Sequence, residues 1–486
     1  MCFTQWFFET VMNQMGFTAL LTGFVPLRKM QKTSNTICAL ATGGGMSAIA
    51  VIRISGPEAF SIGDKLFRGK IRLQEAAGNT IHFGKIVHDS QWLDEVLVSV
   101  FRAPHSYTGE NTLEISCHGS PYIQQQILQA LYAVGAQPAS AGEFTLRAFL
   151  HGKIDLSQAE AVADLIASEN QASHQLGLRQ LRGGYSEIIR GLRDELLRFA
   201  ALIELELDFS TEDVEFADRK LLEVIVKDVI GVLSQLRDSY ALGNVLKAGI
   251  PVTIAGRPNA GKSTLLNALL KEERAIVTPV AGTTRDTIED EMVLHGVRFR
   301  FIDTAGLRHT TDEVEKLGIE RSYDKIKQAE IVLYLFDVLH TSKEEVYHDL
   351  AEIRQLAGEQ RLLIAVGNKA DLLTAKPVLA ITEPLVWISA KTNQGLKELE
   401  DLLLQRINSG KGQKDEHLVT NARHFDAINR ALISLEHVIA GLHNQLPGDL
   451  LAMDLRAALH DLSGIVGEVY SDDVLGAIFS KFCIGK

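Results

Sequence analysis

Short apolar runs dominate the first third of the chain. Stretches rich in β-branched and apolar residues at positions 48–55, 95–101 and 112–117 predict strands, and residues 121–134 predict a helix with proline in its first turn. We expect this part to form a small α+β domain.

A helical pattern replaces the strands from about residue 155 to residue 246. Apolar residues recur there every three or four positions, at Ile189, Leu192, Leu196, Phe199 and Ile203. The same spacing returns much later, at Phe425, Ile428, Leu432, Leu435, Ile439 and Leu442. Gly183 and Gly184 predict a break between helices. Because each apolar stripe needs a partner, we expect the two stretches to pack as one helical domain around an insertion; the alternative is two independent bundles.

Strands and helices alternate between these two stretches, over residues 250–404, which predicts a parallel α/β sheet. Gly243 and Gly249 on one side, and residues 409–414 on the other, are plausible hinges.

Composition narrows the choice of function. The chain has 49 Lys and Arg against 61 Asp and Glu, a net charge of −12, which disfavours a protein that coats nucleic acid through a broad basic face. The four cysteines are scattered without metal-ligand spacing, which predicts a reducing, cytoplasmic location. The sequence contains no apolar run of about 18 residues, so we expect no membrane span.

Residues 1–34 precede the first recognisable strand. They include aromatic and apolar residues, but no Lys or Arg stands before the apolar stretch, as a secretory signal requires. Met30 lies just ahead of the strand, so we interpret the segment as an over-long start, with a disordered extension as the alternative. Expression from Met30 should leave activity intact.

A phosphate-binding motif follows the predicted strand at 250–255. Residues 256–263 read G-x-x-x-x-G-K-S and lead into a predicted helix. Glycines let backbone N–H groups surround phosphates, and the helix N-terminus adds partial positive charge. Lys262 is expected to reach the β- and γ-phosphates, and Ser263 to ligate Mg²⁺. The expected contacts of this loop are Asn259, Ala260, Gly261, Lys262, Ser263 and Thr264.

Three further motifs follow in order, each at the end of a predicted strand. The first motif, Asp303, Thr304, Ala305 and Gly306, can bind Mg²⁺ and the γ-phosphate. The second motif is Asn368, Lys369, Ala370 and Asp371, and its aspartate can accept hydrogen bonds from guanine N1–H and N2–H₂. The third motif, Ser389, Ala390 and Lys391, can donate backbone N–H groups to guanine O6. Because adenine lacks matching donors, this order predicts GTP rather than ATP.

Hydrolysis needs a substitute for a missing glutamine. Ras-type enzymes use a Gln at the position after the motif glycine, here Gly306, to orient the attacking water. In this chain that position is Leu307. The side-chain carbonyl of Asn259 could hold K⁺, which would neutralise developing charge; alternatively, Asn259 only stabilises its loop. A switch-I-like loop carries Thr284, placed to ligate Mg²⁺. Its expected nucleotide contacts are Thr278, Pro279, Val280, Ala281, Gly282, Thr283 and Thr284.

These motifs resemble the MnmE (also called TrmE) family of tRNA-modification GTPases. The resemblance includes residues 256–263, 281–286 and 303–308, and continues at 50–56, 107–110, 117–119, 142–149, 153–160 and 482–486. It implies a multidomain protein: an N-terminal α+β domain, an all-α helical domain and an inserted α/β Ras-like (P-loop) GTPase domain. The implied divisions are an extension at 1–34, a folate-binding and dimerisation domain at 35–152, a helical domain at 153–248 plus 405–486, and a GTPase domain at 249–404.

The resemblance also implies an activity. The family is similar in being a K⁺-dependent GTPase that forms a homodimer. With the FAD-dependent partner MnmG (GidA), it adds a (carboxymethyl)aminomethyl group at C5 of the wobble uridine (U34) of certain tRNAs, using a one-carbon unit from a tetrahydrofolate derivative. The acidic chain suggests that tRNA is contacted largely through the complex. The rival hypothesis is a GTP-switched assembly or scaffold protein, for example in ribosome maturation, without folate chemistry.

Site residues follow from the same resemblance. The implied K⁺ ligands are Asn259, Thr278, Val280 and Thr283, and the implied folate contacts are Arg53, Glu114, Lys153 and Lys486. A carboxylate can read adjacent pterin N–H donors, and Lys and Arg suit the ligand's carboxylates. The nearby loop at residues 41–45 reads Ala-Thr-Gly-Gly-Gly, which departs from the family's Ala-Thr-Pro-Pro-Gly.

Two further residues have competing interpretations. Glu315 matches a carboxylate that positions the attacking water, but its type and surroundings alone favour an exposed acidic residue. Cys483 fits a catalytic thiol near the folate pocket or a buried apolar cysteine. A prenylation box at Cys483 is rejected, because Gly485 and Lys486 fit that motif poorly.

Overall fold

The computed structural model describes residues 35–208, 218–272, 290–302, 325–359, 361–375, 377–409 and 418–486. The chain divides into two compact units. One joins Met1–Ala163 to His460–Lys486, and the other is Asp164–Leu459.

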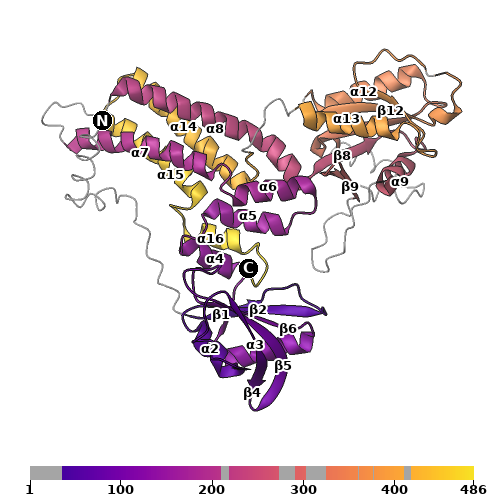
Figure 1. Ribbon diagram of the computed structural model, residues 1–486. Helices are drawn as coiled ribbons and strands as arrows, with labels where there is room; N and C mark the ends of the chain where they lie inside the picture. Colours follow the sequence, from indigo (N-terminus) through magenta and orange to yellow (C-terminus); the bar gives the residue numbers. More distant parts are fainter. Residues whose placement is uncertain are drawn as a thin grey trace. The chain divides into compact units, whose positions relative to one another are not determined.

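The first unit is built on a seven-stranded sheet with the order β3-β4-β5-β6-β2-β1-β7. Its strands are β1 (Ile37–Leu40), β2 (Ile49–Ser55), β3 (Phe67–Gly69), β4 (Thr80–His88), β5 (Gln91–Phe101), β6 (Thr112–His118) and β7 (Gln137–Pro138). Helices α2 (Ala59–Leu66) and α3 (Pro121–Ala133) contact the sheet and each other (Figure 1). Alternate strand residues such as Ile52, Val98 and Ile115 are buried with them in one core, so the period-two pattern in the sequence marks this face.

The opposite face of this sheet carries exposed apolar side chains. Phe83 lies directly across from Leu97, and Ile81 stands two residues before Phe83 on the same strand. The exposed fractions are 65% for Ile81, 62% for Phe83 and 47% for Leu97. We call these three residues the open apolar face.

Three helices complete the first unit: α4 (Glu143–Leu150), α5 (Leu156–Ile166), which runs on into the second unit, and α16 (Asp472–Phe479). They share a core that includes Phe149, Leu156 and Phe479. The residues after α16 lie against the start of α4, where Phe144 N donates to Lys486 O at 3.2 Å. The unit therefore combines an early and a late part of the chain.

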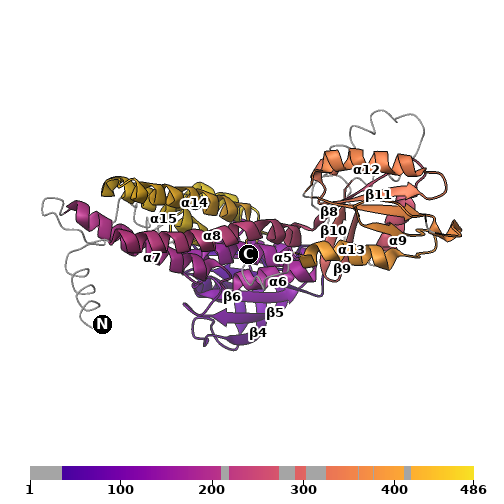
Figure 2. The ribbon, with the colours of Figure 1, turned by 90° about the horizontal axis from the view of Figure 1, so that it is seen from above.

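Long helices form one part of the second unit: α6 (Gln171–Leu181), α7 (Ser186–Asp208), α8 (Arg219–Ala248), α14 (Ala422–His443) and α15 (Gly448–Val466), whose last residues belong to the first unit. Helices α8 and α14 lie side by side (Figures 1 and 2). Tyr240 stacks on Phe425 with ring centroids 4.4 Å apart, and α7 packs on α8. The early and late helical stretches therefore pack together, as their spacing predicted.

A six-stranded sheet with the order β13-β12-β11-β8-β10-β9 forms the other part. Its strands are β8 (Ile250–Ala255), β9 (Asp290–Leu294), β10 (Val297–Phe301), β11 (Ile331–Asp337), β12 (Leu362–Asn368) and β13 (Leu385–Trp387). Neighbouring strands are parallel except for the β9–β10 pair.

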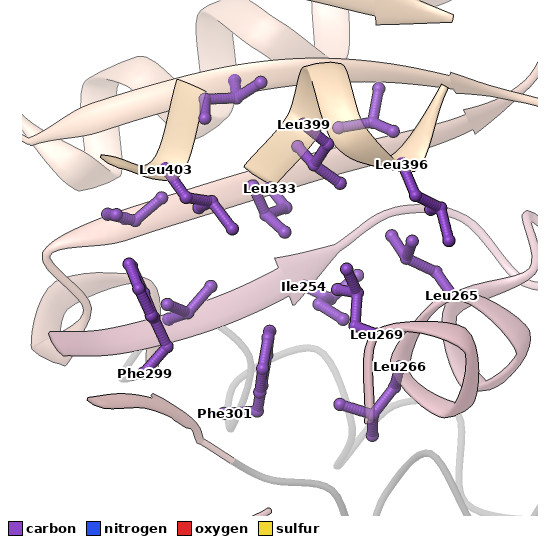
Figure 3. Close-up of a cluster of buried hydrophobic side chains, with 14 of the residues drawn as sticks. Ile254, Leu265, Leu266, Leu269, Phe299, Phe301, Leu333, Leu396, Leu399 and Leu403 are labelled. Carbon is purple, nitrogen blue, oxygen red and sulfur yellow. The ribbon is translucent and has the colours of Figure 1, made fainter. Parts of the chain in front are cut away.

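Helices cover both faces of this sheet. Helices α9 (Lys262–Glu272) and α13 (Leu396–Ser409) bury Leu269 and Leu399 against strand residues such as Phe299 (Figure 3). Helix α12 (Lys343–Ala357) packs on the other face through a separate core that contains Tyr334 and Leu350. The predicted α/β sheet is confirmed, and its described strands pair in parallel except for β9 with β10. Among the described helices, none is long and apolar enough to cross a membrane.

Candidate functional site

The phosphate loop connects the central strand β8 to α9, as predicted. Gly256 has φ +149°, and a Cβ there would lie 2.1 Å from the Leu335 carbonyl oxygen. Gly261 has φ +98°, and a Cβ there would lie 2.3 Å from Asn368 Nδ2. Both glycines of the motif are therefore required by backbone conformation and by close packing.

Lys262 stands at the first position of α9, inside this loop. Its Nζ donates to Gly256 O at 2.7 Å and to Arg257 O at 3.0 Å, and burial lowers its pKa. Because these carbonyl partners carry no net charge, the ammonium charge remains available to an anion at the N-terminus of α9. Ser263 and Thr264 follow in the first turn of that helix.

Asn259 and Ala260 form the turn of the loop. Asn259 adopts a left-handed conformation with φ +63°, and Ala260 is only 2% exposed. The loop backbone is thus tightly constrained at the position from which the Asn259 side chain projects.

Asn368, at the end of β12, ties the phosphate loop to a third segment. Its Nδ2 donates to Ala260 O at 2.8 Å, and its Oδ1 accepts from Ala390 N at 3.0 Å. The structure thus brings the phosphate loop, the Asn368–Asp371 motif and the Ser389–Lys391 motif together at the carboxyl edge of the sheet. Ligands of open α/β sheets bind at this edge.

Asp371 and Lys369 lie beside this junction. Asp371 is exposed in the short 3₁₀ helix η1 (Ala370–Leu372). Lys369 has φ +67°, and its Nζ donates to Asp337 Oδ2 at 2.7 Å. Burial would raise the pKa of Asp337, but hydrogen bonds from Lys369 and from the Leu339 N–H outweigh burial and lower it to about 2. Lys369 is therefore held by an ionised carboxylate, a contact that no motif predicted.

Several predicted site residues lie outside the described residues. These are the switch-I-like residues Thr278, Pro279, Val280, Ala281, Gly282, Thr283 and Thr284, the Mg²⁺ and γ-phosphate motif Asp303, Thr304, Ala305 and Gly306, and Glu315.

A second constellation lies in the first unit, where Arg53 on β2 faces Glu114 on β6. Arg53 Nε donates to Glu114 Oε1 at 2.9 Å, and Arg53 Nη1 donates to Gly485 O at 3.2 Å. The Arg53 guanidinium also lies over the rings of Tyr107 and Phe144, 5.3 and 5.5 Å from their centroids. The predicted Arg53 and Glu114 thus form one half-buried polar pair, flanked by aromatic rings and by the returning tail.

The tail brings Lys486 and Cys483 to this region. Gly142 N donates to Cys483 O at 3.4 Å, and the Cys483 side chain is exposed rather than buried. Lys153 Nζ donates to Pro104 O at 3.2 Å, so Lys153 contacts the loop that also supplies Tyr107. The tail thus reaches Arg53 through Gly485, and Lys153 contacts the loop whose Tyr107 ring lies beside the Arg53 guanidinium.

The first unit also holds a buried cation, Arg147, that no motif in the sequence predicted. Arg147 is 1% exposed, and it contacts Glu143 at 2.8 Å and Glu110 at 3.2 Å. These residues stand in the Thr-Gly-Glu and Gly-Glu-Phe-Thr-Leu-Arg stretches that carry the resemblance. Their contacts give those stretches a structural role that spacing alone could not indicate.

Two family models match the chain. The model described as the GTP-binding protein TrmE N-terminus matches residues 36–153, and the one described as the MnmE helical domain matches residues 156–483.

Curated relatives match along nearly the whole length. The tRNA modification GTPase MnmE of Flavobacterium johnsoniae is 54% identical over 463 residues, which are 93% of this chain and 99% of that protein. The protein of the same name from Christiangramia forsetii is 52% identical over 473 residues, 94% and 100% of the two chains. That from Parabacteroides distasonis is 48% identical over 463 residues, 93% and 100%.

Proposed function

Because the chain belongs to the MnmE family of tRNA modification GTPases, we propose that it hydrolyses GTP in the course of modifying tRNA. One observation carries the GTP part of this proposal: Asn368 joins the phosphate loop to the Ser389–Lys391 segment at the carboxyl edge of the sheet. A nucleotide seated there would meet Lys262 at its phosphates and Asp371 at its base.

Guanine selectivity is assigned to Asp371. A carboxylate accepts from both N1–H and N2–H₂ of guanine, whereas an amide would instead match the 2-oxo group of xanthine. Asp371→Asn should therefore weaken GTP binding and strengthen xanthosine triphosphate binding, each by about tenfold or more. Asp401→Asn, at an exposed position on α13, is the matched control and should leave both affinities unchanged. Retention of GTP preference by Asp371→Asn would contradict the assignment.

Two metal ions are part of the proposal. Ser263, with Thr284, would hold Mg²⁺, and the tightly turned loop around Asn259 suits a K⁺ ligand set completed by Thr278, Val280 and Thr283. The bound cations would neutralise the charge that develops on the phosphates. Lys262 orients the phosphates, and Glu315 positions water where Leu307 cannot. Together these residues define the Ras-like GTPase domain that we place at 249–404, inserted into a helical domain at 153–248 plus 405–486.

The second constellation is proposed as the folate site, in a domain at residues 35–152. Glu114 offers a carboxylate to pterin N–H groups, Arg53, Lys153 and Lys486 offer cations to the ligand's carboxylates, and Cys483 supplies an exposed thiol beside them. The Arg53–Glu114 pair and the rings of Tyr107 and Phe144 beside Arg53 support this assignment of the site. The open apolar face supports the homodimer, because exposed apolar patches mark association surfaces.

The complete proposed function is that of a K⁺-dependent GTPase in the cytoplasm. With the FAD-dependent MnmG protein as partner, it takes part in adding a (carboxymethyl)aminomethyl group at C5 of U34 of certain tRNAs, using a one-carbon unit from a tetrahydrofolate derivative. GTP hydrolysis by the full chain should be faster in KCl than in NaCl at equal ionic strength, and 5-formyltetrahydrofolate should bind at the first unit. Equal rates in the two salts together with no folate binding would favour a GTP-switched assembly protein instead. Nucleoside analysis of tRNA from a deletion strain tests the modification itself.

A further inference from the structure

A charged cluster joins the phosphate loop to two acidic residues that lie outside every motif found in the sequence. Arg257, the second residue of the loop, makes a two-pronged contact: its Nε donates to Asp349 Oδ2 at 2.8 Å and its Nη2 to Asp349 Oδ1 at 3.0 Å. Arg257 also pairs with Glu345. Both carboxylates come from α12, so one side chain connects the loop to that helix.

Both acidic partners of Arg257 are also held by contacts to other residues. Glu345 belongs to the capping box of α12, in which Ser342 N donates to Glu345 Oε2 at 2.8 Å. Asp349 accepts from the hydroxyl of the buried Tyr334 at 2.8 Å, and His348 lies 3.7 Å from it. Burial would raise the pKa of Asp349, but hydrogen bonds from Arg257 and Tyr334 outweigh burial and lower it. The acids are therefore charged and held in place by the helix and the sheet.

The backbone of Arg257 links this cluster to the phosphate-binding lysine. The Arg257 carbonyl accepts from Lys262 Nζ at 3.0 Å and from Ala260 N at 3.4 Å. Asn368 holds the loop from its other side through Ala260 O. The loop is thus anchored at two points, one provided by a GTPase motif and one by α12.

We propose that Arg257 is a positioning residue for nucleotide binding, which holds the phosphate loop to α12 and shields bound phosphates from Glu345 and Asp349. The inference rests on the proposed GTP site and adds a determinant to it. Removing Arg257 would release the start of the loop and leave two unpaired carboxylates beside it. Both effects act against a polyanionic nucleotide, and the repulsion between like charges is screened by salt.

The test measures the Kd of the full chain for GDP in Mg²⁺ by calorimetry, at low and high salt. Arg257→Ala should raise the Kd about tenfold at low salt and less at high salt. The triple variant Arg257→Ala, Glu345→Gln, Asp349→Asn should recover part of that loss, because the repelling charges are gone. The matched control is Arg354→Ala, which removes an arginine of α12 that pairs with Glu383 at 3.4 Å and should bind GDP like the wild type.

Arg257→Lys provides a second test that does not depend on whether the alanine variant folds. It keeps the charge but cannot make the two-pronged contact, so it should weaken GDP binding about threefold with no added salt dependence. A Kd within about twofold of wild type for Arg257→Ala, or a loss that neither salt nor the triple variant relieves, would overturn the inference. Failure of the wild-type chain to bind GDP would instead count against the proposed GTP site, so the two failures are distinguishable.

Discussion

Asn368→Ala should loosen two loops at once. Asn368 is 3% exposed, and its amide joins Ala260 O at 2.8 Å to Ala390 N at 3.0 Å. Both partner residues are themselves buried, at 2% and 4% exposure. Alanine would leave a buried carbonyl and a buried N–H without these bonds.

The magnitude follows from those two bonds. Each is worth about 1 kcal/mol net, and about 1–3 kcal/mol when its partner is left unsatisfied in the interior. The free energy of local opening should therefore fall by about 2–6 kcal/mol for the two bonds together, which speeds amide exchange from the open state by about 30-fold or more.

Hydrogen exchange with mass spectrometry measures this change in the full chain. Peptides that cover residues 256–264 and 388–391 should both exchange faster in Asn368→Ala. The control is Asn421→Ala, which removes the N-cap bond to Arg423 N at 2.9 Å and should cost about 1 kcal/mol at the start of α14 only. Exchange of both loops within about threefold of wild type, while the control accelerates exchange at the start of its own helix, would show that Asn368 does not hold the two loops.

Three further predictions concern other parts of the chain. Glu315→Ala should reduce the GTP hydrolysis rate strongly with little change in GTP affinity, and a near-normal rate would remove Glu315 from the mechanism. Burial raises the pKa of the Cys38 thiol to about 12 and that of Cys117 to about 11, so iodoacetamide at mildly alkaline pH should label the exposed Cys483 and spare both, as peptide mapping would show. Because the raised folded-state pKa values favour the protonated thiols, their contribution to stability should be fully present below about pH 8.5 and should decline above it as the unfolded chain ionises first; a midpoint of urea unfolding that rises there would contradict this. Arg147→Met should lower the free energy of unfolding of the first unit by about 3–5 kcal/mol, because Glu110 and Glu143 lose their buried counter-charge, and an unchanged urea transition would show that the network contributes nothing.

Local pattern was enough to predict an α/β sheet in the second unit, several of its strands and its phosphate loop. The run 250–255 is apolar and ends in a glycine motif, and β8 and α9 occupy those positions. The strands expected to end at Asn368 and just before Ser389 are likewise present, as β12 and β13. These elements were predictable because their hydrophobic runs, turns and helix starts are all encoded within a few neighbouring residues.

Contacts between distant residues were not predictable in the same way. β4 was missed because Gly84 and polar residues interrupt its pattern, and its pairing with β5 defines it as a strand. The Arg257–Asp349 contact joins residues 92 positions apart. Nothing in the local spacing distinguishes Asp349 from any other acidic residue on the surface of a helix, so only the folded chain reveals the pair.

The return of the tail to β2 has a consequence for biosynthesis. Arg53 reaches Gly485 across 432 residues of sequence. Since ribosomes add about 5–20 residues per second, roughly 20–90 s separate the emergence of these two partners. During that interval the sheet of the first unit lacks the tail segment that contacts Arg53, while the intervening chain can fold as it emerges. A polypeptide cut short by a late stop codon would keep the seven strands of this sheet yet never complete the surroundings of Arg53.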